Sequence, residues 1–103
     1  MEIVRAKSGI ASREPVTVIE HFRNARQKNK ELVAMVSADE PPRTWTWEQY
    51  YDEVETIARA FIRLGVDRFD TVNILGFNSP EWVMANMAAI LAGGKVSFPF
   101  LGL

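Results

Sequence analysis

The hydrophobic positions of this chain follow a helical period most clearly between residues 50 and 64. Apolar side chains recur there every three or four residues, which predicts an amphipathic helix; they are Tyr50, Val54, Ile57, Ala58, Phe61, Ile62 and Leu64. Thr46 followed by Gln49 fits a capping box, so we expect the helix to begin directly after Thr46. Gly65 stands where a left-handed residue commonly ends a helix.

Two further helices are predicted on either side of this one. Thr17 and Glu20 form a second capping box, and the helix that they begin ends in the polar run 26–30. Ser79 and Pro80 are typical of a cap and a first helical residue, which predicts a helix over residues 80–92. This last helix is apolar on nearly every side, so most of it is expected to be buried.

Short apolar or alternating runs between the helices predict strands. Residues 31–37 suit a buried strand, and the loop 38–43 separates them from the alternating Thr and Trp residues of 44–47. Further runs at 71–75 and 95–100 enclose the last predicted helix. Strand, helix and strand with short connections predict a parallel βαβ unit with a right-handed crossover. The fold class is therefore α/β.

The domain organisation follows from how much of this pattern the chain can bury. Residues 1–15 carry no periodicity and are expected to form a mobile leader, whereas residues 16–103 belong to one unit. Parallel sheets are normally covered on both faces, and two other helices are too few to cover helix 80–92 as well. We therefore expect an incomplete part of a larger α/β domain that folds poorly or self-associates when alone. The alternative is that residues 1–15 fold over helix 80–92.

Composition and charge exclude several classes of protein. The 103 residues are 48% hydrophobic and 24% charged, as in a globular domain, and the net charge of −1 lacks the basic excess of a nucleic-acid-binding domain. There is no cysteine, which removes disulfides and thiolate chemistry. The longest uncharged stretch, 82–94, is shorter than the ~18–20 residues of a membrane-spanning helix. The amino terminus is not a secretory signal, so these features are compatible with a cytoplasmic protein.

The segment 76–82 is the first candidate for chemistry, because it joins a predicted strand to a helix, a position where nucleotide sites often lie. It matches neither the dinucleotide fingerprint nor the phosphate loop, so helix capping is favoured over anion binding. A group of aromatic residues could stack on a ring, although their spacing favours packing; they are Trp45, Trp47, Tyr50 and Tyr51.

The ionisable residues offer no convincing constellation. His21 is expected to be exposed to solvent, and Asp52, Glu53 and Glu55 lie on one helix face without a cleft that would separate their pKa values. We therefore assign no catalytic, cofactor-binding or metal-binding residue in this chain.

Four segments resemble, in order and spacing, the amino-terminal region of the AMP-forming acyl-CoA synthetases, which are adenylate-forming enzymes. They are residues 46–54, 58–65, 74–82 and 89–94. The sequence of residues 74–82 is most similar to that of the bubblegum-type long-chain fatty acid–CoA ligases; it reads Ile-Leu-Gly-Phe-Asn-Ser-Pro-Glu-Trp. The resemblance runs from about Thr17 to Gly94 and covers only the opening portion of a family enzyme.

The resemblance implies a parent enzyme that activates a long-chain fatty acid with ATP and Mg²⁺ to an acyl-adenylate and then transfers the acyl group to coenzyme A. The phosphate loop, the nucleotide-contacting motifs and the catalytic lysine of the family match no position here, so the chain alone is expected to be inactive. Residues 95–103 depart from the family pattern, which indicates a truncated gene model or splice product. A cytoplasmic parent, peripheral to the endoplasmic reticulum membrane, fits the same resemblance. The alternative is a small independent α/β protein-interaction module that docks its apolar helix on a partner.

Overall fold

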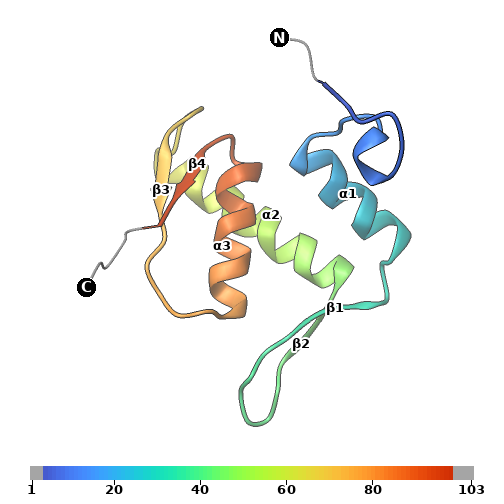
Figure 1. The fold of residues 1–103 in the computed structure, drawn as a ribbon. Coiled ribbons are helices and arrows are strands. Elements are labelled where there is room, and N and C mark those ends of the chain that lie inside the picture. Colours follow the sequence, from blue (N-terminus) through green and yellow to red (C-terminus); the bar gives the residue numbers. More distant parts are fainter. Residues whose placement is uncertain (1–3, 99–103) are drawn as a thin grey trace, which may run out of the picture.

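The computed structural model describes residues 4–98, in which helices form the centre and strands lie at the edges (Figure 1). The elements, in chain order, are η1 (Ile10–Ser12), α1 (Val18–Lys28), β1 (Val33–Val36), β2 (Thr44–Thr46), α2 (Trp47–Arg63), β3 (Thr71–Asn73), α3 (Pro80–Leu91) and β4 (Lys95–Ser97). The long helix α2 packs against both α1 and α3.

The predicted helix ends are confirmed. Thr46 Oγ1 accepts a hydrogen bond from the Gln49 N–H at 3.2 Å, and the Gln49 side chain accepts one from the Thr46 N–H at 2.9 Å. Thr17 and Glu20 form the same reciprocal pair at the start of α1. Gly65 follows the last turn of α2 with φ at 102°, in the left-handed region that favours glycine.

The strands form two separate pairs. β1 and β2 are antiparallel and make a hairpin, whereas β3 and β4 are parallel with α3 between them in the chain. The parallel unit and the α/β class are therefore confirmed. The strands are shorter than the runs 31–37 and 71–75, and the end of the run 95–100 lies outside the described residues.

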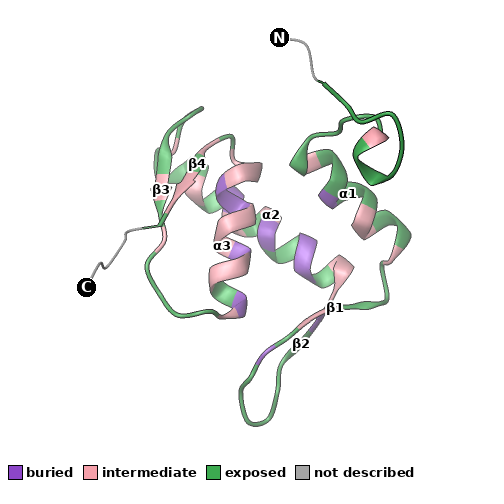
Figure 2. Ribbon diagram, viewed as in Figure 1, coloured by how far each residue is buried: buried purple, intermediate pink, exposed green. Residues whose placement is uncertain are grey.

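The core lies where α2 meets α3 and α1 (Figure 2). Val54 of α2 and Ala88 of α3 have no exposed surface, and the small Ala88 side chain lets the two helices approach closely. On the α1 side, Phe22 packs its ring against Tyr50 and Tyr51, with ring centroids 4.9 and 5.1 Å apart. One contiguous cluster thus holds the three helices together.

Two expectations about burial are wrong. The run 31–37 was expected to form a buried strand, but the side chains of Val33 and Val36 are each 57% exposed. Ile62 and Leu64 belong to the predicted buried stripe of α2 and are 55% and 82% exposed. The physical reason is the same in both cases: periodicity identifies an apolar face, but no other part of residues 4–98 packs over these positions.

Helix α3 packs against α2 and β4, and its other sides are only partly covered. Pro80, Met84, Ala88 and Ala89 are buried, whereas the remaining apolar side chains of the helix are half-buried. The alternative in which residues 1–15 cover this helix is wrong for the described part of the leader, residues 4–15. That part lies at the α1 end of the molecule, away from α3, and its Arg5 side chain donates a hydrogen bond to Glu14 (Figure 1). Whether the leader is mobile stays a prediction.

We expect the isolated chain to self-associate as its concentration rises. Among residues 4–98, the parallel pair β3–β4 has no third strand at its edges, and α3 leaves apolar surface half-exposed. Both features favour contact between copies. Light scattering over a dilution series, combined with hydrogen exchange, measures the effect. A monodisperse monomer with protected amides in residues 82–92 would contradict this expectation.

Candidate functional site

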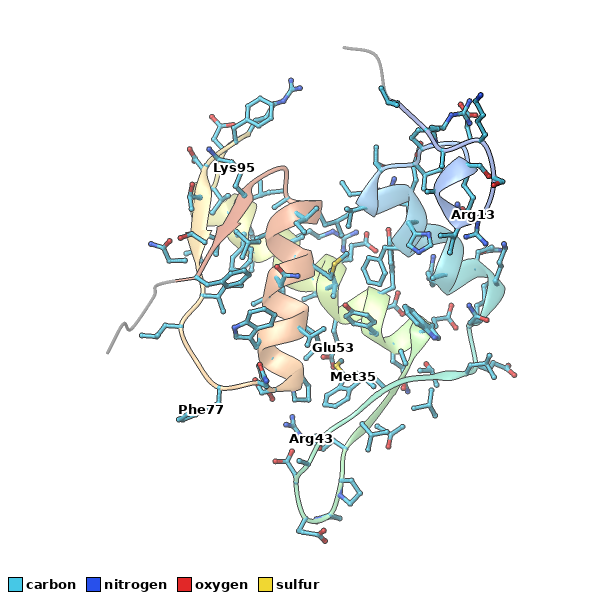
Figure 3. The ribbon with its side chains drawn as sticks, in the orientation of Figure 1. Arg13, Met35, Arg43, Glu53, Phe77 and Lys95 are labelled. Carbon is cyan, nitrogen blue, oxygen red and sulfur yellow. The ribbon has the colours of Figure 1, made fainter. Side chains whose placement is uncertain are left out.

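The amino terminus of α3 is the position that the sequence singles out for chemistry. Ser79 Oγ accepts a hydrogen bond from the Trp82 N–H at 3.2 Å, which is the predicted cap. A hollow of about 390 Å³ lies beside this turn, lined by the loop that follows β3, residues 74–77, and by Trp82. The Phe77 side chain is 94% exposed at its rim and projects from the loop (Figure 3).

Arg43 connects the hairpin loop to the first turn of α3. Its Nε donates to Asp39 Oδ2 at 2.7 Å, and its Nη1 donates to Glu81 Oε1 at 2.9 Å. The guanidinium also lies over the Trp45 ring, 5.1 Å from the centroid. Arg43 is thus committed to two carboxylates, and the carboxylate of Glu81 occupies the electropositive helix end. The arrangement supports the capping interpretation of residues 76–82.

The Arg43 guanidinium holds the pKa of Glu81 below its ordinary value, mainly through their hydrogen bond, and it lowers the pKa of Asp39 in the same way. A carboxylate whose folded pKa is depressed adds stability above its unfolded pKa and loses it as the pH falls through the folded pKa. We therefore expect the urea midpoint of the wild-type chain to fall on acidification below about pH 4.5 more steeply than that of the double variant Asp39→Asn, Glu81→Gln. The difference should be small and should shrink in high salt, because these groups are exposed.

Glu40→Gln is the matched control for this pH dependence, because it removes a carboxylate from the same loop without touching Arg43. Its urea midpoint should follow the wild-type curve. If the urea midpoints of the wild type and the double variant fell equally steeply below about pH 4.5, the ion pairs of Arg43 would add nothing to the stability of the fold.

The aromatic residues contribute to packing, which the sequence analysis favoured over stacking on a ligand ring. Tyr51 is held by α1: its hydroxyl accepts a hydrogen bond from Arg23 Nε at 3.0 Å, and the Arg26 guanidinium lies 4.7 Å from the centre of its ring. Tyr50 packs on Phe22 and on Trp47, and burial raises the pKa of its hydroxyl. These contacts join α1 to α2.

The ionisable residues considered from the sequence do not converge. His21 is exposed, as expected. Glu55 accepts a hydrogen bond from Arg59 at 2.6 Å, and Asp52 lies 3.7 Å from Arg26, so each of these carboxylates is paired with a different arginine. Glu53 is exposed on α2, and together with Asp52 it lines an open hollow beside β2. Within residues 4–98, these two carboxylates are not grouped with a third possible metal ligand.

A second hollow, of about 210 Å³, lies between the three helices and was missed by the sequence analysis. Arg23, Tyr51, Glu55 and Arg59 contribute its polar groups, and Ala58, Ile62 and Leu91 its apolar wall. The four polar residues come from two helices that are separated by the hairpin. Their spacing in the chain gave no signal, because only the docking of α1 onto α2 brings them together.

The absence of cofactor-binding and metal-binding residues from this chain stays a prediction. Within residues 4–98, no three His, Cys, Asp or Glu side chains are grouped so that they could hold a metal ion. The loop between β3 and α3, residues 74–79, contains no lysine, and the carboxylate of Glu81, in the first turn of α3, is paired with Arg43. Over the same residues, no helix has the length and apolar character needed to cross a bilayer.

Comparison with known proteins gives consistent matches. The family model of the AMP-binding enzymes matches residues 22–100. The long-chain-fatty-acid–CoA ligases ACSBG2 of Rattus norvegicus and Xenopus laevis are 42% and 40% identical over 90 and 88 residues, which cover 86% and 84% of this chain. The chain spans only 14% and 12% of the length of these two relatives.

Comparison with solved structures points to the same family. The O-succinylbenzoate coenzyme A synthetase of Bacillus subtilis, solved in complex with AMP, superposes with a TM-score of 0.71 and 26% identity. The superposition covers 80% of this chain and 21% of that one. These matches confirm the resemblance to AMP-forming acyl-CoA synthetases and, within them, to the bubblegum-type ligases. Because the family model spans most of its length, the chain belongs to the family of AMP-binding enzymes.

Proposed function

We propose that this chain is the amino-terminal segment of a long-chain fatty acid–CoA ligase of the bubblegum type. The parent enzyme would convert a fatty acid and ATP to acyl-AMP and pyrophosphate, and then transfer the acyl group to coenzyme A with release of AMP. The observation that carries the proposal is the 40–42% identity to two such ligases over 88 and 90 residues of this chain. Localisation in the cytoplasm, with the parent peripheral to the endoplasmic reticulum membrane, belongs to the same proposal.

Within that parent, the segment would act as a scaffold. Its buried groups are the apolar side chains between α2 and α3 and the aromatic contacts between α1 and α2, and its charged side chains pair with one another at the surface. ATP, Mg²⁺ and coenzyme A would bind residues of the parent outside this segment.

The chain by itself is expected to show no ligase activity. Adenylate formation needs positioned positive charge at the reacting phosphate, and the phosphate loop and catalytic lysine that the family resemblance implies match no position of this sequence. Purified chain given palmitate, ATP, Mg²⁺ and coenzyme A should form no palmitoyl-CoA above a heat-treated sample. Measurable turnover would overturn this expectation.

An exchange experiment tests the scaffold function directly. The matched 90 residues of the rat ligase are replaced by those of this chain, and palmitoyl-CoA formation is measured. We expect activity within about tenfold of the parent, because the exchanged segment contributes packing and no reacting group. The same chimera carrying Val54→Asp serves as the negative control. A chimera that melts like the rat enzyme but has no activity would contradict the proposal.

The interaction module remains a second candidate, and one observation favours it. Leu75 and Phe77, in the loop before α3, are 67% and 94% exposed, and large apolar side chains this accessible mark many protein interfaces. The genomic sequence that follows the codon of Leu103 separates the two candidates. An open frame that encodes a Ser/Thr/Gly-rich loop ending in lysine supports the ligase, whereas a stop followed by unrelated sequence supports the module.

A further inference from the structure

The hollow between the three helices combines cationic groups with an apolar wall. Arg23 of α1 and Arg59 of α2 both line it, together with the Tyr51 side chain, and Ile62 and Leu91 form part of its wall. Tyr51 is only 6% exposed, and its hydroxyl oxygen accepts a hydrogen bond from Arg23 Nε at 3.0 Å. The hydrogen bond between Arg23 and Tyr51 helps to join α1 to α2, but the scaffold described above gives no role to the other polar groups of the hollow.

The hydrogen-bond donors outnumber the acceptors that the hollow offers. Arg23 Nε donates to the Tyr51 oxygen, which leaves the tyrosine's own hydrogen available to donate to another group. The Nη groups of Arg23 have no acceptor among residues 4–98. Glu55 is the carboxylate of the hollow, and it already accepts from Arg59 at 2.6 Å. Two guanidinium groups therefore face one carboxylate, and the site has an excess of one positive charge.

The size and the wall restrict the ligand that could supply the missing acceptor. A volume of about 210 Å³ is below the ~300–1,000 Å³ of sites for drug-sized molecules, so the hollow suits a group of about one amino-acid residue. Ile62 is 55% exposed and Leu91 half-buried, so an aliphatic group could cover apolar surface on both. A planar carboxylate matches the paired donors of Arg23 and the hydroxyl of Tyr51.

We propose that this hollow binds the carboxylate of a small aliphatic acid, with the carboxylate on Arg23 and Tyr51 and the aliphatic group against Ile62 and Leu91. Such a group occurs in a free acid and at the carboxyl terminus of a polypeptide that ends in an aliphatic residue. This inference does not depend on the ligase assignment, because none of its residues takes part in the proposed reaction.

The probes are N-acetyl-leucine, its uncharged analogue N-acetyl-leucinamide, and acetate, which has the charge without the side chain. Binding is followed by NMR on chain labelled at the Ile and Leu methyl groups, at a concentration where light scattering shows a monomer. We expect saturable shifts at Ile62 and Leu91 with N-acetyl-leucine and at least about tenfold weaker binding of the other two. A pentapeptide that ends in leucine, with a free or an amidated carboxyl group, tells a polypeptide source from a free acid.

Substitutions separate binding from folding. Arg23→Gln should weaken the binding of N-acetyl-leucine about tenfold. Arg13→Gln, which changes an arginine outside the hollow, should leave this affinity unchanged. Glu55→Gln should strengthen binding, because it removes the competing carboxylate; a merely structural role of these residues predicts no such gain.

If the isolated chain gives no dispersed spectrum, the same variants are measured in the rat-ligase chimera by equilibrium dialysis of labelled N-acetyl-leucine. Equal binding of acid and amide, or an Arg23→Gln variant that binds like the wild type, would overturn the proposal in either setting.

Discussion

Replacing Val54 by aspartate is expected to abolish cooperative folding of this chain. Val54 has no exposed surface and is the largest side chain that is completely buried among residues 4–98. A carboxylate at that position would lie between α2 and α3 with no partner, and an uncompensated buried charge costs about 3–5 kcal/mol or more. The free energy of unfolding of a small domain is only about 5–15 kcal/mol, and a chain of this length belongs at the low end of that range.

Urea unfolding followed by far-ultraviolet circular dichroism measures the effect, at concentrations below the onset of association. Val33→Asp is the matched control, because it introduces the same group at a valine that is 57% exposed in β1. The control should stay within about 0.5 kcal/mol of the wild type. An equal loss of stability in Val54→Asp and Val33→Asp would mean that the core is not where the structure places it.

Gly94→Ala is expected to destabilise the βαβ unit by about 1–3 kcal/mol. A Cβ at this position would lie 2.9 Å from the carbonyl oxygen of Asp70 and 3.3 Å from that of Ala89. Both oxygens are backbone atoms with fixed partners: Asp70 accepts from the Lys95 N–H at 2.7 Å, and Ala89 accepts from the Gly94 N–H at 2.9 Å. The added methyl group can be accommodated only by moving β4 away from the turn before β3.

Gly76→Ala is the control for this substitution. A Cβ at Gly76 meets no atom within 4 Å, and its backbone is outside the left-handed region, so the variant should unfold at the wild-type urea concentration or slightly above it. Hydrogen exchange at the amides of Lys95 and Ile74 reports the local loss in Gly94→Ala. Unchanged protection there would show that β4 accommodates the methyl group without cost.

The candidate site was predictable from the sequence only in part. The cap at Ser79 was predicted correctly, because a helix end is set by residues three positions apart. The Arg43–Glu81 contact was not predicted, since it joins residues that are 38 positions apart and depends on how the hairpin meets α3. The hollow around Arg23 and Tyr51 was missed for the same reason, because it forms only when α1 docks on α2.

The sequence by itself determined the ends of the helices, the parallel βαβ order and the family. Each of these rests on local signals, such as the capping boxes at Thr17 and Thr46 and the glycines that follow α2 and α3, or on the sequence of residues 74–82. The tertiary structure alone decided which apolar side chains are buried. Val54 and Val33 are both valines in segments whose apolar pattern predicts burial, yet Val54 is completely covered and Val33 is 57% exposed. Burial depends on which segments pack against a face, and periodicity within one segment carries no information about its neighbours.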